Sequence, residues 1–521
     1  MSQLSTVSIF KTQYEEYPRQ GPFHPDEQFP EYPFAATMLG DNWVYGAVRQ
    51  MLVNLGLDSE HVGSPEWNPF SNLLRAGQHV VIKPNLVISE HELGLPGLLA
   101  SVANGSVIRP IVDYAYRAVG PSGHITITDS PIKEVDFDKI TRINGLQEIV
   151  AFYRSQGFEL QLLDIRDLQA YRDEHSVILR YDRLPGDPRG YQVVNLGRKS
   201  MLAQLPAAVH RRFRSTAAIY ENEATKHHTE TVNEYSMPKT ILEADAIISV
   251  AKLKVHRKAG ITASLKNMIG TTNEKRWLPH HRAGTPSDGG DMTADGATTD
   301  RKLREVLQDV ASRSRYGKFL RLRIYPLLHD AYRLVKPWLN LSGQGDPTQD
   351  FVEGDWHGND TIWRTTLDLN MVIRYADKQG QIRATPQRNY LSVIDGIIGG
   401  DREGPLHPSP KPAGVLVAGV DPVAVDLVCT ALMGFDATTI PTVSRAHETP
   451  YFLGTNRADE IELRANAPRF TTWDALRGAH FAFIPAKGWE GHVELKPARA
   501  SAAVEPVAVT GLAHAAASEG T

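Results

Sequence analysis

The stretch KLKVHRKAGITASLKNMIG, residues 252–270, concentrates positive charge behind an apolar run. The run at 247–251 is typical of a buried strand, and the first seven residues after it include Lys252, Lys254 and His256. Positive charge crowded onto the end of a buried strand predicts a binding site for a small anion. We expect Lys252 and Lys254 to bind this anion. We expect His256 to transfer protons, because imidazole titrates near neutral pH.

The residues from Gly260 to Asn267 extend this hypothesis. A glycine followed by Thr262 and a serine before an apolar periodic segment is typical of a helix start, whose free N–H groups bind anions. We expect a carboxylate or phosphate over 260–264, with Asn267 among the binding residues and Lys266 among the catalytic ones. The GxxxxGK[ST] signature of phosphate loops does not occur in the sequence, and a solvated basic turn is the alternative interpretation.

Two further segments leave predicted strands with polar side chains. Lys83-Pro84-Asn85 ends a β-branched run, and proline cannot continue a central strand, so the chain should bend there and expose Lys83 and Asn85. Asp395 leads into the glycine-rich segment 396–404, where backbone can approach a ligand closely. Ligands of open α/β sheets bind at the carboxyl ends of strands, so we expect these residues to join one anion site. An incidental surface turn is the alternative for the first segment.

Two polar segments, LPHHRAGTPSDGGD at 278–291 and GDWHGND at 354–360, could hold a metal or a proton-transfer pair. Imidazole and carboxylate groups in a glycine-rich loop suit a divalent cation or acid–base chemistry. His280 is our second candidate for proton transfer. The candidate metal ligands are His281, Asp288, Asp291, His357 and Asp360. A polar surface loop explains the first segment equally well, and a helix N-cap explains Asp360.

These segments are separated by regular apolar patterns. Strands are predicted at 80–87, 125–128, 160–164, 246–250, 392–398 and 415–420. Helices are predicted at 44–55, 108–119, 146–155, 361–370 and 422–433. Strands that alternate with helices predict an α/β fold, here two-lobed, with largely parallel sheets covered by helices and a helical insertion.

The predicted organisation has five parts. They are an N-terminal extension (1–75), a first α/β lobe with the basic motif (76–300), a basic helical insertion (301–350), a second α/β lobe (351–496) and a disordered tail (497–521). We interpret the insertion as an amphipathic helical hairpin packed on the sheet, and peripheral contact with a membrane surface through 301–339 is the alternative. The tail lacks the apolar periodicity that offsets the entropy of ordering.

Composition limits the classes of function. A net charge of -4 over 521 residues argues against a surface that coats nucleic acid. One cysteine, Cys429, excludes an intramolecular disulfide and any Cys-ligated cluster. The N-terminus has no signal pattern, and no apolar run is long enough to span a bilayer. We therefore expect a cytoplasmic protein without a transmembrane segment.

Four motifs carry a resemblance to a known family: KPNLV (83–87), AKLKVHRKAGITASLKNMIG (251–270), VIDGIIGGDREGP (393–405) and GVDPVAVD (419–426). On these motifs the chain resembles the family of domain of unknown function 362. The segments 278–291 and 357–364 are similar to a cluster-free branch of that family, which is associated with bacterial surface-polysaccharide gene neighbourhoods. Many relatives carry a ferredoxin-like iron–sulfur segment, but the single cysteine makes an iron–sulfur cluster an unexpected cofactor here.

The layout also resembles, more weakly, that of the nickel-pincer lactate racemase family. That family runs a strand into a His-containing, Gly-rich loop, then a lysine and a later histidine, and the matching order here is His256, Gly260, Lys266 and His280. This likeness bears on the fold and on the location of the site more than on the cofactor, which the sequence leaves unknown.

The sequence thus predicts an enzyme that acts on a small anion by acid–base chemistry, with assistance by a divalent metal as an option. The candidate substrates are a carboxylate, a phosphate ester and a nucleotide-activated sugar, within bacterial surface-polysaccharide metabolism. The alternatives are a non-catalytic anion- or glycan-binding protein of polysaccharide assembly and a redox protein with an external cofactor. The expected partner is a small anionic molecule rather than nucleic acid, and the sequence does not define the reaction type or the oligomeric state.

Overall fold

The computed structural model describes residues 4–19, 21–35, 38–172, 178–215, 222–299, 301, 351 and 353–496. The predicted helical insertion, beyond its first residue, and the predicted tail lie outside the described residues.

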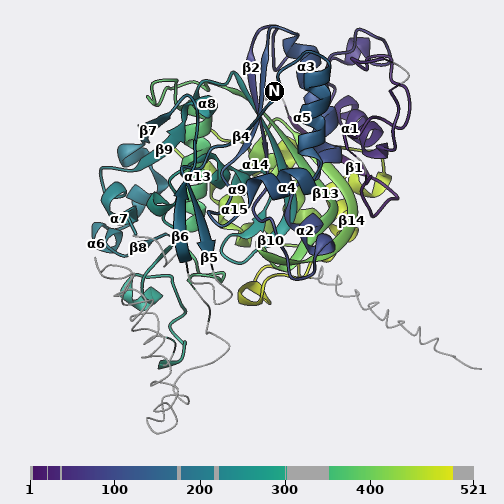
Figure 1. Cartoon of the computed structure of the whole chain (residues 1–521). Helices are drawn as coiled ribbons and strands as arrows, with labels where there is room; N and C mark the ends of the chain where they lie inside the picture. The colour runs from purple at the N-terminus through teal and green to yellow at the C-terminus, as the bar shows by residue number, and fades with distance from the viewer. Residues whose placement is uncertain are drawn as a thin grey trace, which may run out of the picture.

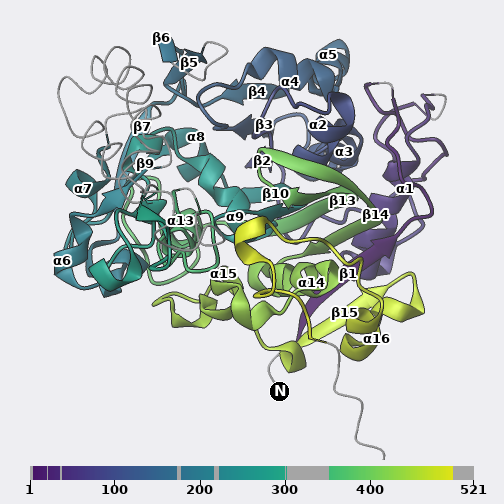
Figure 2. The same cartoon turned by 90° about the horizontal axis from the view of Figure 1, so that it is seen from below.

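The centre of the fold is a mixed, mostly parallel sheet (Figures 1 and 2). Its order is β15 (Ile461–Ala465), β1 (Ser5–Lys11), β14 (His407–Gly419), β13 (Asn389–Glu403), β10 (Ala246–His256), β2 (His79–Pro84), β3 (His124–Asp129) and β4 (Gln161–Asp164), and β11 (Gly260–Thr262) pairs with β10. β10 is parallel to both β2 and β13, whereas β14 is antiparallel to its two neighbours. The predicted α/β class with a largely parallel sheet is confirmed. Strands of both predicted lobes belong to this one sheet, because β10 pairs directly with β13.

Helices cover both faces of the sheet, as Figure 2 shows. The predicted helices correspond to α1 (Trp43–Asn54), α3 (Gly105–Val119), α5 (Leu146–Ser155), α13 (Ile362–Tyr375) and α14 (Pro422–Met433). Side chains alternate along each strand. Ile82 and Val250 therefore pack in the core formed with α1, α3 and α5, whereas Val81 and Ile247 pack on the other side with α13.

Shorter elements surround this centre. Three small antiparallel pairs are formed by β5 (Leu168–Arg172) with β6 (Ile178–Arg183), β7 (Tyr191–Asn195) with β9 (Glu234–Pro238), and β8 (Phe213–Arg214) with β12 (His281–Arg282). The short helices are α2 (Leu95–Ser101), α4 (Phe137–Ile143), α6 (Ala207–His210), α7 (Ala224–His227), α8 (Lys239–Leu242), α9 (Ser264–Asn267), α15 (Pro441–Ser444) and α16 (Trp473–Gly478).

Unequal strand lengths create the space in which a site can form. β2 ends at Pro84, opposite Val250 of β10, as the proline predicts. β10 continues for six more residues and carries Lys252, Lys254 and His256 beyond the end of β2. Charged side chains on β10 therefore project where the neighbouring strand has already turned away.

Within the described residues, no single helix is long and apolar enough to cross a membrane. α2 and α3 meet that test only as a pair that is bent by 42°. α2 contacts β13 and β14, and α3 contacts β2 and β3.

Candidate functional site

A cavity of about 380 Å³ lies where β2 and β3 end beside the extended half of β10. Eight of the residues singled out from the sequence line it: Lys83, Asn85, Lys254, His256, Thr262, Lys266, Asn267 and His280. They come from strands, a short helix and a loop that are far apart in the chain, and this convergence is what the strand-end argument predicts.

Two asparagines connect the lysines on the two faces of the sheet. Asn267 Oδ1 accepts from Lys83 Nζ at 2.8 Å and from Asn85 Nδ2 at 3.2 Å. Asn85 Oδ1 in turn accepts from Lys254 Nζ at 2.9 Å. Lys83 also forms a 2.7 Å ion pair with Asp129, at the end of β3. The charge of Lys83 is thus compensated within the protein.

Lys254 is buried without such compensation. Its Nζ donates to the carbonyl oxygen of Ser101 at 2.6 Å, and it forms no ion pair within the described residues. Burial lowers the pKa of Lys254 well below its usual value, and the charges of Lys252, Lys266 and Lys83 lower this pKa further. A negatively charged ligand would stabilise the ammonium form of this side chain.

Lys266, on α9, has the fewest polar partners among the described lysines that line the cavity. Its side chain is 8% exposed and lines the cavity, yet its Nζ has no hydrogen bond or ion pair in the part of the chain that the structure describes. Burial, reinforced by the charge of Lys258, lowers the pKa of Lys266 to about 7. Burial also lowers the pKa of Lys275 to about 7, but the Nζ of Lys275 donates to the carbonyl oxygen of Ile269 at 2.6 Å. Of Lys266 and Lys275, only Lys266 has both a pKa near 7 and an amine without a hydrogen-bond partner among the described residues.

The two cavity histidines both use Nδ1 for backbone hydrogen bonds, but they carry their protons on different ring nitrogens. His256 Nδ1 accepts from the backbone N–H groups of Lys258 (3.1 Å) and Ala259 (3.3 Å), so a neutral ring carries its proton on Nε2. His280 Nδ1 lies 2.9 Å from the carbonyl oxygen of Leu278 and must donate to it, which leaves a lone pair on Nε2. Burial lowers the pKa of both rings well below the usual value, and the charge of Lys266 is the largest electrostatic contribution in each case. The pair therefore offers one N–H donor and one proton acceptor.

The wall of the cavity has a surplus of positive charge. Seven Lys and Arg side chains and four carboxylates line it among the described residues. Asp129 is paired with Lys83, and Asp355 with Lys258 at 2.8 Å. Three buried hydroxyl groups in the wall have no hydrogen-bond partner within the described residues, those of Ser130, Ser215 and Thr262. Unsatisfied hydroxyls beside uncompensated lysines suit a ligand with several negatively charged oxygens.

Three of the residues predicted to bind the anion lie outside the cavity. Lys252 forms a buried ion pair of 3.0 Å with Asp395 and also donates to the hydroxyl of Tyr17 at 2.7 Å. Gly260 belongs to the hairpin strand β11 rather than to a helix start, and it packs beneath Ile440 and Trp489. The prediction that Gly260 begins a helix whose N–H groups bind the anion was wrong, because the pairing of β11 with β10 overrides the local helix-start pattern.

The backbone N–H groups at the start of α9 are already occupied. Asp426 of α14 accepts from the N–H of Ser264 at 2.6 Å and from that of Leu265 at 3.1 Å. The carboxylate predicted over this turn is therefore one of the protein's own. Its role is to hold α9, and with it Lys266, against α14.

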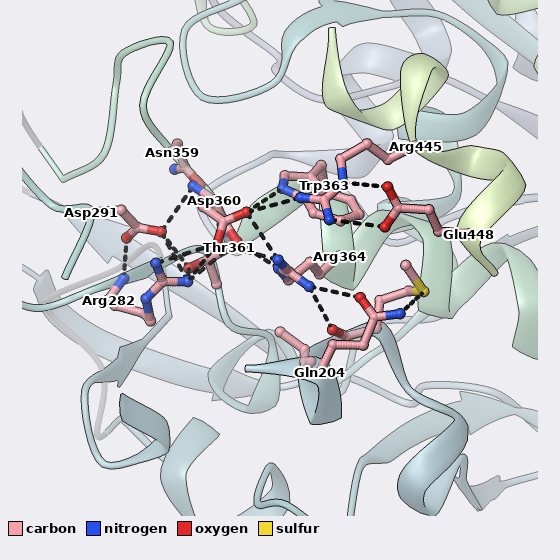
Figure 3. A network of polar contacts seen from close by, with 12 residues as sticks. Gln204, Arg282, Asp291, Asn359, Asp360, Thr361, Trp363, Arg364, Arg445 and Glu448 are labelled. Carbon is pink, nitrogen blue, oxygen red and sulfur yellow. Dashed lines mark hydrogen bonds and ion pairs between the residues drawn. The ribbon is translucent and has the colours of Figure 1, made fainter. Parts of the chain in front are cut away.

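The candidate metal ligands are dispersed. Figure 3 shows Asp291 and Asp360 among arginines: Arg282 lies 3.5 Å from Asp291 and 3.4 Å from Asp360, and Arg364 lies 3.1 Å from Asp360. Asp288 accepts from the hydroxyl of Thr285, His357 stacks on His492, and His281 lies in β12. No group of three or more His, Cys, Asp or Glu side chains within the described ranges could hold a metal ion. Asp291 and Asp360 form ion pairs with arginine instead, which neutralises them.

This arginine–carboxylate network has a positioning function. Asn359, seen at its edge in Figure 3, donates from Nδ2 to the carbonyl oxygen of His280 at 3.0 Å and to that of Gly354 at 2.9 Å. Thr365 donates to the carbonyl oxygen of Pro279 at 2.7 Å. The residues at the start of α13 thus hold the backbone of Pro279 and His280 in place.

Comparison with known proteins gives a family assignment for the middle of the chain. Residues 193–431 match the family described as Domain of unknown function (DUF362). The resemblance to this family that the four sequence motifs carry is confirmed over this segment, which is a little under half of the chain. A thylakoid-associated protein of Synechocystis sp., sll1697, is 36% identical over 80 residues. That similarity covers 15% of this chain and 24% of the relative, so it spans about a quarter of the relative's length.

The DUF362 segment supplies only part of the cavity. It contains β10, α9 and the loop of His280, whereas Lys83, Asn85 and Asp129 precede it in the chain. The site is therefore formed jointly by the family segment and by the strands β2 and β3 that come before it.

Sequence reasoning missed Asp129 and Lys275 as cavity residues. Asp129 directly follows the predicted strand at 125–128, so the rule that selected Lys83 would also have found it. Lys275 lies in a polar stretch without periodicity, and nothing in its local sequence distinguishes it from a surface lysine.

Proposed function

We propose that the protein is an enzyme that acts on a small carboxylate or phosphate ester by acid–base chemistry. The observation that supports this proposal most directly is the convergence of Lys266, His256 and His280 on one positively charged cavity. Lys254 and Lys275 would bind the anionic group, since neither has an ion-pair partner among the described residues and both line the cavity.

The proton-transfer roles follow from the tautomers. His280 Nε2 has a lone pair and would accept a proton from the substrate, while His256 Nε2–H would donate a hydrogen bond to an oxygen on which negative charge develops. Lys266 is poised between its amine and ammonium forms near neutral pH and can act as either base or acid.

The size of the cavity narrows the substrate class. Small-molecule sites occupy ~300–1,000 Å³, and a cavity of about 380 Å³ lies near the lower limit. A carboxylate or a simple phosphate ester therefore suits it better than a nucleotide-activated sugar. Sugar phosphates of surface-polysaccharide metabolism in the cytoplasm are candidates within that class.

Anion binding is tested by thermal unfolding at fixed ionic strength with phosphate, sulfate, acetate or chloride. A ligand at 100 times its Kd adds about 2.7 kcal/mol to the free energy of unfolding. We expect phosphate or acetate to raise Tm in a saturable way, and Lys254→Met to weaken the response. Lys226→Met, which replaces an exposed lysine on α7, is the control and should respond like wild type. Equal effects of chloride and phosphate, unchanged in Lys254→Met, would refute the anion site.

Catalysis is tested separately by NMR in D₂O, with loss of carbon-bound protons from a panel of small carboxylates and phosphate esters as the signal. We expect exchange in wild type and a loss of exchange in His280→Phe. Saturable binding without exchange or turnover on the whole panel would instead favour a non-catalytic anion-binding protein.

A further inference from the structure

We propose that Lys266 forms a covalent imine with the carbonyl group of an oxo acid bound in the cavity. This inference rests on the proposed function, because the carboxylate of the oxo acid would occupy the anion site. It deepens that function by naming a substrate class with two groups, a carboxylate and a ketone or aldehyde.

The state of the Lys266 side chain carries the inference. A buried lysine normally forms an ion pair or donates several hydrogen bonds. Lys83 and Lys254, in the same cavity wall, do so through Asp129 and the Ser101 carbonyl oxygen. Lys266 is 8% exposed, and in the described part of the chain it does neither. An amine that is buried, unpartnered and open to a cavity is available as a nucleophile.

The protonation state agrees with this geometry. With a pKa of about 7, roughly half of Lys266 is the free amine at pH 7, against about one part in 3,000 for a lysine of ordinary pKa. The neutral fraction is therefore on the order of 10³-fold larger than that of a lysine in water.

The surrounding groups suit each part of the reaction. The Lys266 nitrogen lone pair attacks the carbonyl carbon, and the C=O π electrons move to the oxygen, to which His256 Nε2–H donates a hydrogen bond. His280 Nε2 accepts the two amine protons in turn and passes them to that oxygen, so that the oxygen leaves as water while the C=N bond forms. One amine and one carbonyl thus give one imine and one water, without an external oxidant or reductant.

The test is reductive trapping of full-length protein with pyruvate or glyoxylate and sodium borohydride, followed by intact mass and peptide mapping. Borohydride delivers hydride to the imine carbon and converts it into a stable secondary amine. Acetone, a ketone without a carboxylate, is the control probe. Lys266→Arg keeps a positive charge but cannot form the imine, and Lys266→Met removes the amine in a second way. The exposed-site control variant is Lys226→Arg.

We expect one adduct on Lys266 in wild type and in Lys226→Arg, at least ~100-fold more than on any exposed lysine, given the neutral fractions above. We expect no adduct at this position with acetone and none in either Lys266 variant. Label on Lys275 instead, label spread over surface lysines, or label that persists in Lys266→Arg would overturn the inference.

Thermal unfolding with phosphate separates this inference from the proposed function. If phosphate raises Tm in wild type but neither oxo acid is trapped, the imine is refuted and the anion site stands. If phosphate has no specific effect on Tm, the anion site of the proposed function is itself refuted. A Tm response to phosphate in Lys266→Met shows that the variant is folded with an intact cavity, so absence of label is then informative.

Discussion

Replacing Lys266 with methionine should change how the stability of the protein depends on pH. Burial and neighbouring cations lower the pKa of Lys266 from 10.5 to about 7 in the folded protein. In the unfolded chain the same amine titrates near ~10.4. Between these values the unfolded chain binds a proton that the folded protein does not, so the free energy of unfolding contributed by Lys266 rises with pH. Methionine has a similar length and no titratable group.

The magnitude follows from the two pKa values. Each pH unit well above the folded pKa adds about 1.4 kcal/mol, so the interval from pH 7 to pH 9 adds roughly 2.3 kcal/mol. Well below pH 7 both states are protonated and the contribution is constant. The difference in free energy of unfolding between wild type and Lys266→Met should therefore shift by roughly 2.7 kcal/mol in favour of wild type from pH 6 to pH 9. At pH 6 the variant should be the more stable protein, because the wild type then holds an ammonium group that is buried without a partner.

Urea unfolding followed by circular dichroism at pH 6 and pH 9 measures this shift. The buffers must not contain phosphate, sulfate or carboxylates, since these anions would stabilise the ammonium form. Lys226→Met replaces an exposed ammonium and should differ from wild type by the same amount at both pH values. A difference between wild type and Lys266→Met that does not change from pH 6 to pH 9 would refute the proposed protonation state of Lys266.

Three further substitutions test the supports of the site. Gly270→Ala would place a methyl group 2.3 Å from Asp129 Oδ1, so we expect a loss of ~1–3 kcal/mol in urea unfolding and a weaker Tm response to phosphate. Asn359→Ala removes the donor to the carbonyl oxygen of His280, so deuterium exchange should slow while the Kd for phosphate stays near that of wild type. Asp426→Ala leaves two buried N–H groups at the start of α9 without their acceptor, which should lower stability by ~1–3 kcal/mol per group in urea unfolding.

The sheet and the position of the cavity were predictable from the sequence because both depend on local patterns. Apolar runs of strand length predicted β2, β3, β10 and β13, and Pro84 predicted where β2 stops. Residues immediately after such strands must lie at one edge of a parallel sheet. Lys83 and Lys254 therefore reach the same cavity although they lie far apart in the chain.

The partners of the charged residues were not predictable, because they come from distant parts of the chain. Lys252 and Lys254 lie two residues apart on one strand and look equivalent in the sequence. Asp395 of the adjacent strand neutralises Lys252, whereas Lys254 donates hydrogen bonds only to amide and carbonyl oxygens. The start of α9 shows the same limit, since the anion at its N–H groups is Asp426, a residue on a helix that follows much later.

Which lysines remain uncompensated decides what the site can do. Asp129, Asp395 and Asp355 arrive from three separate elements and pair with Lys83, Lys252 and Lys258. Burial of an ammonium group without such a partner destabilises the fold. The same burial lowers the pKa values of Lys254, Lys266 and Lys275. A ligand with negatively charged oxygens removes this penalty where it binds. The same arrangement that destabilises the empty cavity therefore provides the free energy with which an anion is held and an amine is kept reactive.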